Sequence, residues 1–323
     1  MLAGYITATT TDFVRVRISD NKIKLIHHKS YTNSDFPNFE SVLSLYLRKT
    51  KGEISVACFG VAGPVIGNKV TATNIPWKVD GQAIKNKFSF NKVTIINDLV
   101  ASSFGLFQLK EDDFFTINKG IKIINGNMGL IAAGTGLGEA LIFYDGKKYC
   151  PYASEGGHVG FSPGNQLEVE LWEYLYGEQE YVEAEDVISL SGLEKIYEFL
   201  LTTGQVPKAE WYKKVKDKSS KIIEMALAGE DEIAVKTLDI FIDCYASEAA
   251  NLALKGMTLG GIYLGGLIAP QIITALEKGR FMERFLKRGK MNVLLSKIPI
   301  SLIIDDKTAL LGAASIASDM SKR

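Results

Sequence analysis

The chain has 323 residues, a length that suits two domains or one large one. Hydrophobic residues make up 46% and charged residues 23%, an ordinary globular composition with enough apolar side chains for a large core. Lys and Arg together number 37, as do Asp and Glu together, so the charge gives no electrostatic reason to expect a nucleic acid or an anionic membrane as a partner.

The first third of the chain alternates predicted strands with predicted helices. Residues 2–18 predict two strands joined by a threonine-rich turn, and residues 39–50 show helical apolar spacing. The stretch ISVACFGVAGPV, residues 54–65, predicts a buried strand that runs into a Gly/Pro loop. Strands that alternate with helices indicate an α/β fold with a mostly parallel sheet.

A carboxylate follows the next predicted strand, in the stretch KVTIINDLVASSFGL of residues 92–106. Val93 to Ile96 predict a buried strand, and an apolar-periodic helix begins after Asn97 and Asp98. Asp98 could cap this helix by accepting hydrogen bonds from its first turn. It could also be a catalytic base, since ligands of open α/β sheets bind at the carboxyl ends of strands. These fifteen residues alone favour the cap.

A second set of elements begins near Met128. Residues 128–149 again predict strand, turn and strand, with a rhythm similar to that of residues 2–23, which indicates a weak internal repeat. Residues 167–255 are mainly helical, and the chain closes with a strand and a small-residue helix. We expect a small α/β domain of residues 1–108 plus 301–323 and a large one of residues 109–300.

The sequence contains two glycine-rich turns, and the first of them could bind phosphate. The stretch AAGTGLGEA holds Gly134, Gly136 and Gly138 between two strands, with Thr135 beside them. Glycines let backbone N–H groups approach an anion, but a tight hairpin would also use them. No Lys-Ser/Thr pair follows, so this is not a Walker loop. Gly265 and Gly266 directly follow a predicted strand, where close strand–helix packing explains them equally well.

A short polar loop, ASEGGHVGFSP, places Glu155 and His158 on either side of a Gly-Gly pair. A lone histidine is more often structural than functional. A site for a sugar, however, needs carboxylates, amides and imidazoles, because each hydroxyl both donates and accepts a hydrogen bond. The sequence shows no further His, Cys or carboxylate ligands close by, so we expect no metal site.

The cellular setting is predicted from absences. Three scattered cysteines form no CxxC pair, which indicates a reducing compartment, and we expect the cytoplasm. The N-terminus has no basic region followed by an apolar stretch, so no signal peptide is expected. No run of about twenty apolar residues exists, so we expect no membrane span.

Several segments together resemble one family, the bacterial glucokinases of the hexokinase type. The resemblance runs from about residue 54 to 318, and the zinc motif of the related repressor–kinase (ROK) group is absent after Gly160. It implies the actin-like ATPase fold, with two ribonuclease H-like α/β domains around a hinged cleft. The segments that carry the resemblance are FGVAGPVIGNKVTATNIPWKVDG, INDLVASSFGL, AAGTGLGEA, SEGGHVGFSP, EDVISLSGLEKIYEFL, GGIYLGGLIAPQI and DDKTALLGAA.

The resemblance also implies roles for individual residues. Asp98 matches the general base that takes the proton of the sugar 6-hydroxyl. The positions that match sugar contacts are Asn97, Glu155, His158 and Glu185, with Thr73 and Asn74 as a further pair near the sugar. The positions that match nucleotide contacts are Thr9 in the first phosphate loop, Gly134, Thr135, Gly136 and Gly138 in the second, and Gly265 and Gly266 near the adenosine.

The first phosphate loop departs from the family pattern, which reads roughly DxGGTxxR. Here the aligned stretch is YITATTTD: Tyr5 replaces the acidic residue, and Thr7 and Ala8 replace the two glycines. Asp12 stands where a basic residue is usual, and only Thr9 matches. The lost carboxylate normally helps to hold Mg²⁺, and an acid in place of a base repels ATP. Each change in isolation would cost about 1–3 kcal/mol.

The expected function is ATP- and Mg²⁺-dependent phosphorylation of a hexose, with glucose as the expected substrate, at the start of glycolysis. The family resemblance implies a homodimer. The alternative is a sugar-binding pseudokinase or sensor, because the sugar half of the site matches the family while the first phosphate loop does not.

Overall fold

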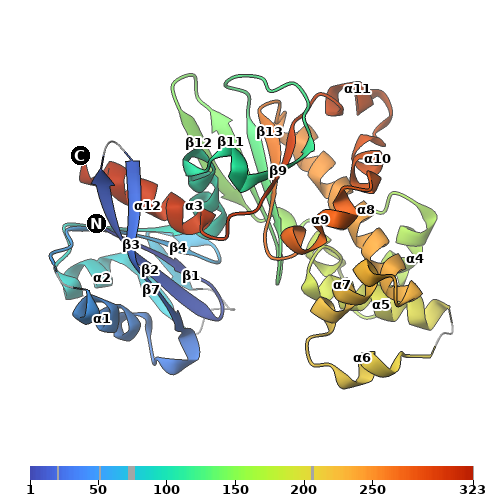
Figure 1. The fold of residues 1–323 in the computed structure, drawn as a ribbon, viewed down its shortest axis with the longest axis horizontal. Coiled ribbons are helices and arrows are strands. Elements are labelled where there is room, and N and C mark those ends of the chain that lie inside the picture. The colour runs from blue at the N-terminus through green and yellow to red at the C-terminus, as the bar shows by residue number, and fades with distance from the viewer. Residues whose placement is uncertain (20–21, 51, 72–76, 205–206, 323) are drawn as a thin grey trace. The chain divides into compact units, whose positions relative to one another are not determined.

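The structure is a computed structural model of the chain and describes residues 1–323 except 20–21, 51, 72–76, 205–206 and 323 (Figure 1). The α/β class predicted from the sequence is confirmed. The chain divides into two compact units, each of which is described by itself. Unit 1 comprises residues 1–113, 151–153 and 305–323, and unit 2 comprises residues 114–150 and 154–304.

Unit 1 is built on a five-stranded sheet with the strand order β3-β2-β1-β4-β8. Strands β1, β2 and β3 are antiparallel to one another in turn, whereas β4 and β8 run parallel to β1. Its strands are β1 (Leu2–Ile6), β2 (Thr10–Ser19), β3 (Lys22–Thr32), β4 (Val56–Val61) and β8 (Lys92–Asn97), with β5 (Val65–Ile66), β6 (Lys69–Thr71) and β7 (Lys78–Asp80) in a small separate sheet. Its helices are α1 (Phe39–Lys49), α2 (Gly81–Phe88), α3 (Asp98–Gly105) and α12 (Thr308–Ser321), and its 3-10 turns are η1 (Asn33–Asp35), η2 (Leu106–Gln108) and η3 (Glu111–Asp113).

Both faces of the unit 1 sheet are covered, because alternate side chains of a strand point to opposite faces. Leu2 belongs to the apolar cluster that the sheet forms with α1 and α2. Its neighbour Ala3 belongs to the cluster on the other face, where α12 packs. In Figure 1, α1 and α2 lie below this sheet and α3 and α12 above it. The unit therefore has three layers, with the sheet between two layers of helices. Loops follow the carboxyl ends of its parallel strands β1 and β4.

Helices α3 and α12 pack at very short range because glycines lie at their contact. A Cβ atom added to Gly105 would lie 1.9 Å from the carbonyl oxygen of Thr308. A Cβ atom added to Gly312 would lie 1.7 Å from the carbonyl oxygen of Ala101. Both distances are far below a van der Waals contact, so a side chain at either position would force the helices apart.

Unit 2 is built on a six-stranded sheet with the order β12-β11-β10-β13-β14-β9. Its strands are β9 (Phe114–Asn118), β10 (Met128–Ala133), β11 (Leu137–Tyr144), β12 (Tyr149–Ser154), β13 (Gly261–Gly265) and β14 (Ile300–Ile303). Its helices are α4 (Gln166–Tyr176), α5 (Leu190–Thr203), α6 (Glu210–Lys214), α7 (Lys218–Ala228), α8 (Glu232–Gly256), α9 (Ile273–Leu276), α10 (Arg280–Leu286) and α11 (Asn292–Leu295). Its 3-10 turns are η4 (Gly156–His158), η5 (Ala184–Asp186), η6 (Ala269–Ile272) and η7 (Gly289–Met291).

The two sheets repeat one topology, which confirms the internal repeat predicted from the sequence. In each, an antiparallel hairpin (β1–β2 or β10–β11) is followed by two strands parallel to its first strand (β4 and β8, or β13 and β14). In each, the third strand of the set, β3 or β12, lies at the edge. The two glycine- or threonine-rich turns therefore occupy equivalent places, each between the first and second strands of its sheet.

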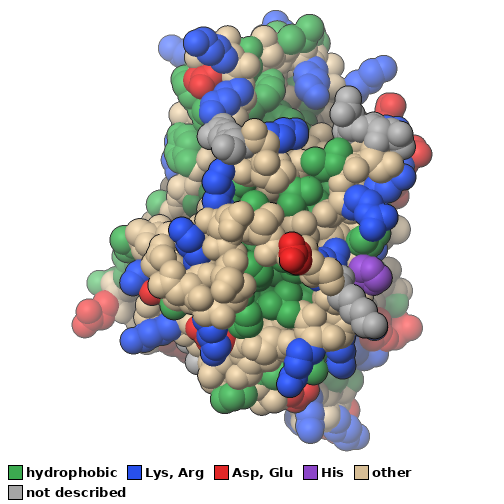
Figure 2. Space-filling view, turned by 90° about the vertical axis from the view of Figure 1, so that its left-hand side faces the viewer, with side chains coloured by type: hydrophobic (Ala, Val, Ile, Leu, Met, Phe, Trp, Pro, Cys, Tyr) green, Lys and Arg blue, Asp and Glu red, His purple; other side chains and the backbone are tan. Residues whose placement is uncertain are grey.

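The surface carries charges of both signs. Figure 2 shows one face, on which Lys and Arg side chains are scattered among apolar and acidic ones. Within the described ranges, no helix combines the length and the apolar character needed to cross a membrane.

Candidate functional site

The N-cap residue of the helix that follows β8 is Asn97, one residue before Asp98. The side-chain oxygen of Asn97 accepts hydrogen bonds from the backbone N–H groups of Leu99 (2.9 Å) and Val100 (3.2 Å). Its Nδ2 donates to the carbonyl oxygen of Gly63 in the loop after β4 (3.2 Å). Asp98 is thus not the N-cap residue that the sequence favoured, although its Oδ1 also accepts a hydrogen bond from the N–H of Leu99 (2.9 Å). Asp98 is the first residue of α3, where the partial positive charge of a helix N-terminus stabilises a carboxylate.

Tyr5, which stands at the acidic position of the family pattern, lies near Asp98. It is in β1, paired with Asp12 of β2 and with Gly60 of β4. Burial raises the pKa of the Tyr5 phenol, and the nearby carboxylates of Asp98 and Asp12 raise it further. The phenol therefore stays neutral, and it borders Asp98 without adding charge.

The turn between β1 and β2 is held by the side chain of Thr7. Its Oγ1 accepts hydrogen bonds from the N–H groups of Thr9 (3.2 Å) and Thr10 (2.9 Å), while the side chain of Thr9 is exposed. Residues 7–10, all of which the structure describes, have no positive φ. The turn thus closes without the glycines of the family pattern, but two of the amides that could have faced a phosphate are already bonded.

Asp12, the acid in place of a base, has a partner. Its Oδ1 lies 2.8 Å from Nε2 of His28 on the neighbouring strand β3. When His28 is protonated, this pair reduces the repulsion that Asp12 would exert on a nucleotide.

In unit 2, the glycine turn after β10 is tied to Glu185. The N–H of Gly134 donates to the carbonyl oxygen of Gly136 (2.8 Å), which closes the turn. The N–H of Leu137 donates to Oε2 of Glu185 (2.8 Å), and a Cβ atom added to Gly136 would lie 2.4 Å from that same oxygen. Gly136 is therefore needed for the close approach of a carboxylate. Thr135 at the tip is exposed, whereas Gly138 lies within β11.

The second glycine pair lies beside this turn, because β10 and β13 are parallel neighbours and end at the same edge of the sheet. Gly266 has a φ of +87°, and a Cβ atom there would lie 2.2 Å from the carbonyl oxygen of Ala133. Only glycine fits that position. Gly265 ends β13, and a Cβ atom there would meet ordinary van der Waals distances.

The polar loop brings Glu155, His158 and Glu185 together with a residue that the sequence analysis missed, Glu183. Nδ1 of His158 lies 3.0 Å from Oε2 of Glu183, and its Nε2 lies 4.0 Å from Glu155. The hydrogen bond with Glu183 raises the pKa of His158, and the charges of Glu183, Glu185 and Glu155 add to this, although burial opposes it. Glu183 does not belong to a regular helical or strand pattern in the sequence. Its spacing of two residues from Glu185 is the one signal that could have indicated that both side chains lie on the same side of the chain.

Ligating atoms of His158, Glu183 and Glu185 lie within 4.8 Å of one another. The sequence does not reveal this group, since Glu183 and Glu185 are distant from His158 along the chain. The expectation that no metal binds here stays a prediction. The predicted sugar-contacting residues Thr73 and Asn74 lie outside the described residues.

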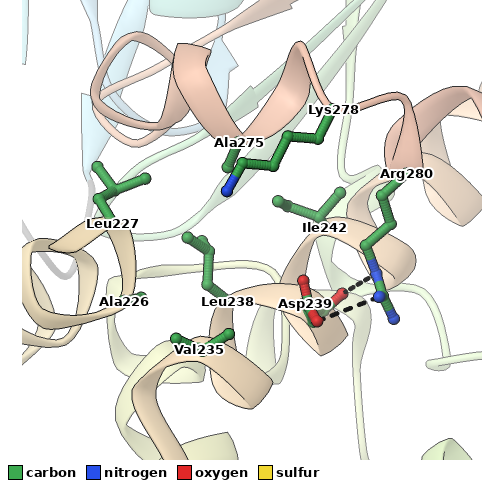
Figure 3. A pocket seen from close by; sticks show the side chains of 9 residues that line it. All are labelled: Ala226, Leu227, Val235, Leu238, Asp239, Ile242, Ala275, Lys278 and Arg280. Carbon is green, nitrogen blue, oxygen red and sulfur yellow. Dashed lines mark hydrogen bonds and ion pairs between the residues drawn. The ribbon is translucent and has the colours of Figure 1, made fainter. Parts of the chain in front are cut away.

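A small cavity lies elsewhere in unit 2, among α7, α8 and the segment that leads to α10 (Figure 3). It measures about 60 Å³ and is lined mainly by apolar side chains, with the ion pair of Arg280 and Asp239 on one side (3.1 Å). Ligand pockets usually measure roughly 300–1,000 Å³, so this cavity is too small for a sugar or a nucleotide. None of the predicted site residues lines it.

Comparisons with known proteins place the chain in one family. A sequence model described as Glucokinase matches residues 2–320. The chain is 34% identical to a glucokinase of Trichormus variabilis over 98% of both chains. It is 33% identical to one of a Synechocystis species over 98% of this chain and 97% of that one.

Solved structures agree. The crystal structure of a glucokinase from an Antarctic psychrotroph has a TM-score of 0.85 at 27% identity and covers 98% of this chain and 99% of its own. A glucokinase from Balamuthia mandrillaris in complex with glucose has a TM-score of 0.83 at 22% identity, over 98% and 93%, and shows a likeness of fold. These proteins have the actin-like ATPase fold, which the repeated topology of units 1 and 2 also has. The chain belongs to the glucokinase family.

Proposed function

We propose that this protein transfers the γ-phosphoryl group of ATP to the 6-hydroxyl of glucose. The observation that carries the proposal is the double engagement of Glu185. Its carboxylate accepts a hydrogen bond from the glycine turn, and its charge acts on His158 in the polar loop. One side chain thus links the element proposed to bind phosphate with the element proposed to bind sugar.

Asp98 is the proposed general base. Phosphoryl transfer depends mainly on positioning and on neutralising charge, so one carboxylate within reach of the attacking hydroxyl is sufficient. One observation supports this: Asn97 is the N-cap of α3 and accepts from Leu99 and Val100, so the Leu99 N–H that also donates to Asp98 has a second acceptor.

Glu155, His158 and Glu185 are the proposed sugar-binding residues in unit 2, with Asn97 in unit 1. Glu183 acts on the sugar only through His158. When the imidazole is neutral, a proton on Nδ1 faces Glu183 and leaves Nε2 free to accept a hydrogen bond from a hydroxyl. The carboxylates of Glu155 and Glu185 complement it as acceptors.

The nucleotide is proposed to bind as its magnesium complex at the glycine turn Gly134–Gly138 and beside Gly266. In unit 1 the fit is incomplete, because Tyr5 offers no carboxylate and Thr7 occupies two amides of the first turn. We therefore expect a weak affinity for MgATP. Under the pseudokinase alternative, the protein would bind the sugar but would not transfer a phosphoryl group to it.

A coupled assay of hexose-dependent ADP release tests the proposal. We expect release with glucose and MgATP, and a loss of about 10²- to 10⁴-fold in Asp98→Asn, with unchanged glucose binding. Asp35→Asn, which removes an exposed carboxylate of the same unit, is the matched control and should retain the rate.

Two outcomes would contradict the proposal. Absence of ADP release together with a glucose-induced rise in melting temperature would leave the pseudokinase. Full turnover by Asp98→Asn would show that another group takes the proton.

A further inference from the structure

A buried carboxyl group lies beneath the polar loop and has no role in the function proposed above. Glu139 is in β11 with only 3% of its surface exposed. Its Oε1 has no hydrogen-bond partner within the part of the chain that the structure describes. An ionised carboxylate without donors is costly to bury, so this group needs either a proton or a neighbour that supplies one.

Charged groups of α8 act on Glu139. Glu248, itself 5% exposed, approaches Glu139, while Asn251 (2.8 Å) and Lys255 (3.5 Å) donate to Glu248. Burial, and to a lesser degree the charge of Glu139, raise the pKa of Tyr245 on the same helix, whose hydroxyl donates to the carbonyl oxygen of Ile131 (3.1 Å). Burial and the charge of Glu248 raise the pKa of Glu139 to about 8, against the opposing effect of Lys255.

At neutral pH Glu139 therefore keeps its proton. Asn251 and Lys255 direct their donors at Glu248, so neither supplies a hydrogen bond to Oε1 of Glu139.

Glu139 supports the polar loop directly. A Cβ atom added to Gly156 would lie 2.2 Å from Oε2 of Glu139, so the carboxyl group is in contact with the backbone of the loop. Ser154 ties the same elements together: its Oγ donates to the carbonyl oxygen of Glu139 (3.2 Å) and accepts from the N–H of Gly156 (3.2 Å). Glu155 and His158, the loop's own titratable residues, flank this contact, and His158 is engaged with Glu183.

We propose that Glu139 is a positioning residue for glucose binding, which holds the loop of Glu155 and His158 in place through the contact of its buried carboxyl group with Gly156. The proposal rests on the sugar-binding role proposed above for that loop. Loss of the proton would leave an ionised carboxylate buried without a donor on Oε1, and the loop backbone at Gly156 would have to shift to admit water or a donor.

The sign of the pH dependence follows from the raised pKa. The folded protein keeps a proton on Glu139 that the unfolded chain has already released, so this group's contribution to stability is complete below the unfolded pKa and is lost as pH rises through about 8. Affinity for glucose should weaken in the same direction, by up to about tenfold per pH unit above pH 8.

The test compares the unmodified protein with Glu139→Gln between pH 5 and 9.5. Glutamine has the shape of the protonated acid but cannot ionise. We expect the Gly156 amide signal in NMR spectra to titrate with a midpoint near pH 8 in the unmodified protein and to stay constant in Glu139→Gln. The glucose-induced rise in melting temperature should fall above pH 8 only in the unmodified protein. Glu173→Gln, an exposed change in the same unit, should behave like the unmodified protein.

The outcomes separate the two proposals. A Gly156 signal that does not titrate, or that titrates equally in Glu139→Gln, overturns the positioning role. The same follows if the glucose response falls equally with pH in both proteins. If glucose has no effect on either protein at pH 6–7, the proposed sugar site fails, while a Gly156 titration abolished by Glu139→Gln would still support the loop contact.

Discussion

Replacing Asn97 by alanine should destabilise unit 1 by about 2 kcal/mol. The change removes the side-chain oxygen that accepts from Leu99 and Val100, and loss of an N-cap costs about 1 kcal/mol. It also removes the hydrogen bond from Nδ2 to the carbonyl oxygen of Gly63, worth about 1 kcal/mol. For a unit of this size, the melting temperature should fall by roughly 4–8 °C.

Asn97→Ser separates the two contributions, since serine caps as well as asparagine but cannot reach Gly63. Its melting temperature should fall by only about half as much as that of Asn97→Ala. Thermal unfolding followed by circular dichroism, without ligands, measures both. If the serine and alanine variants have the same melting temperature, the cap does not stabilise α3. If neither melting temperature differs from that of the unmodified protein, neither the cap nor the bond to Gly63 contributes the free energy assigned to it.

Three further changes test other parts of the structure. Gly312→Ala should lower stability by about 1–3 kcal/mol because of its clash with α3, and an unchanged melting curve would refute the close packing. Glu183→Gln should lower the pKa of His158, because it removes the main cause of the upward shift; an NMR titration of the imidazole checks this, and an unchanged midpoint would refute the pairing. Arg284→Met should cost about 3–5 kcal/mol by leaving the buried Glu168 without its cation, whereas Arg284→Lys should cost less; equal melting of the methionine variant and the unmodified protein would contradict this.

The buried helices and strands of the fold could be predicted well from the sequence. The apolar run of residues 54–61 and the helical spacing of residues 39–50 correspond to β4 and α1. Edge strand β3 was not predicted, because residues 22–32 are largely exposed and lack a regular apolar alternation. Lysines on such a strand keep it soluble at the edge of the sheet, at the expense of the pattern by which strands are recognised.

The candidate site was predicted where single segments carry it, and missed where distant segments meet. The glycine turn and the loop of His158 each stand out in a few residues. Glu183 meets His158 only through folding, and Glu139 meets Glu248 in the same way. In the first turn, the sequence showed the missing glycines but not that the hydroxyl of Thr7 replaces solvent as the acceptor for two amides.

The return of α12 to the first sheet has a consequence for synthesis on the ribosome. One face of β1 and β4 is covered by apolar residues of α12, which are translated only after the whole of unit 2. The sheet of unit 1 is therefore synthesised first but keeps an uncovered apolar face until α12 is made. By then, all strands of unit 2 have been synthesised. Nascent chains arrested before residue 305 should consequently bind chaperones through unit 1. This binding should end once α12 has left the ribosome and packs on the sheet.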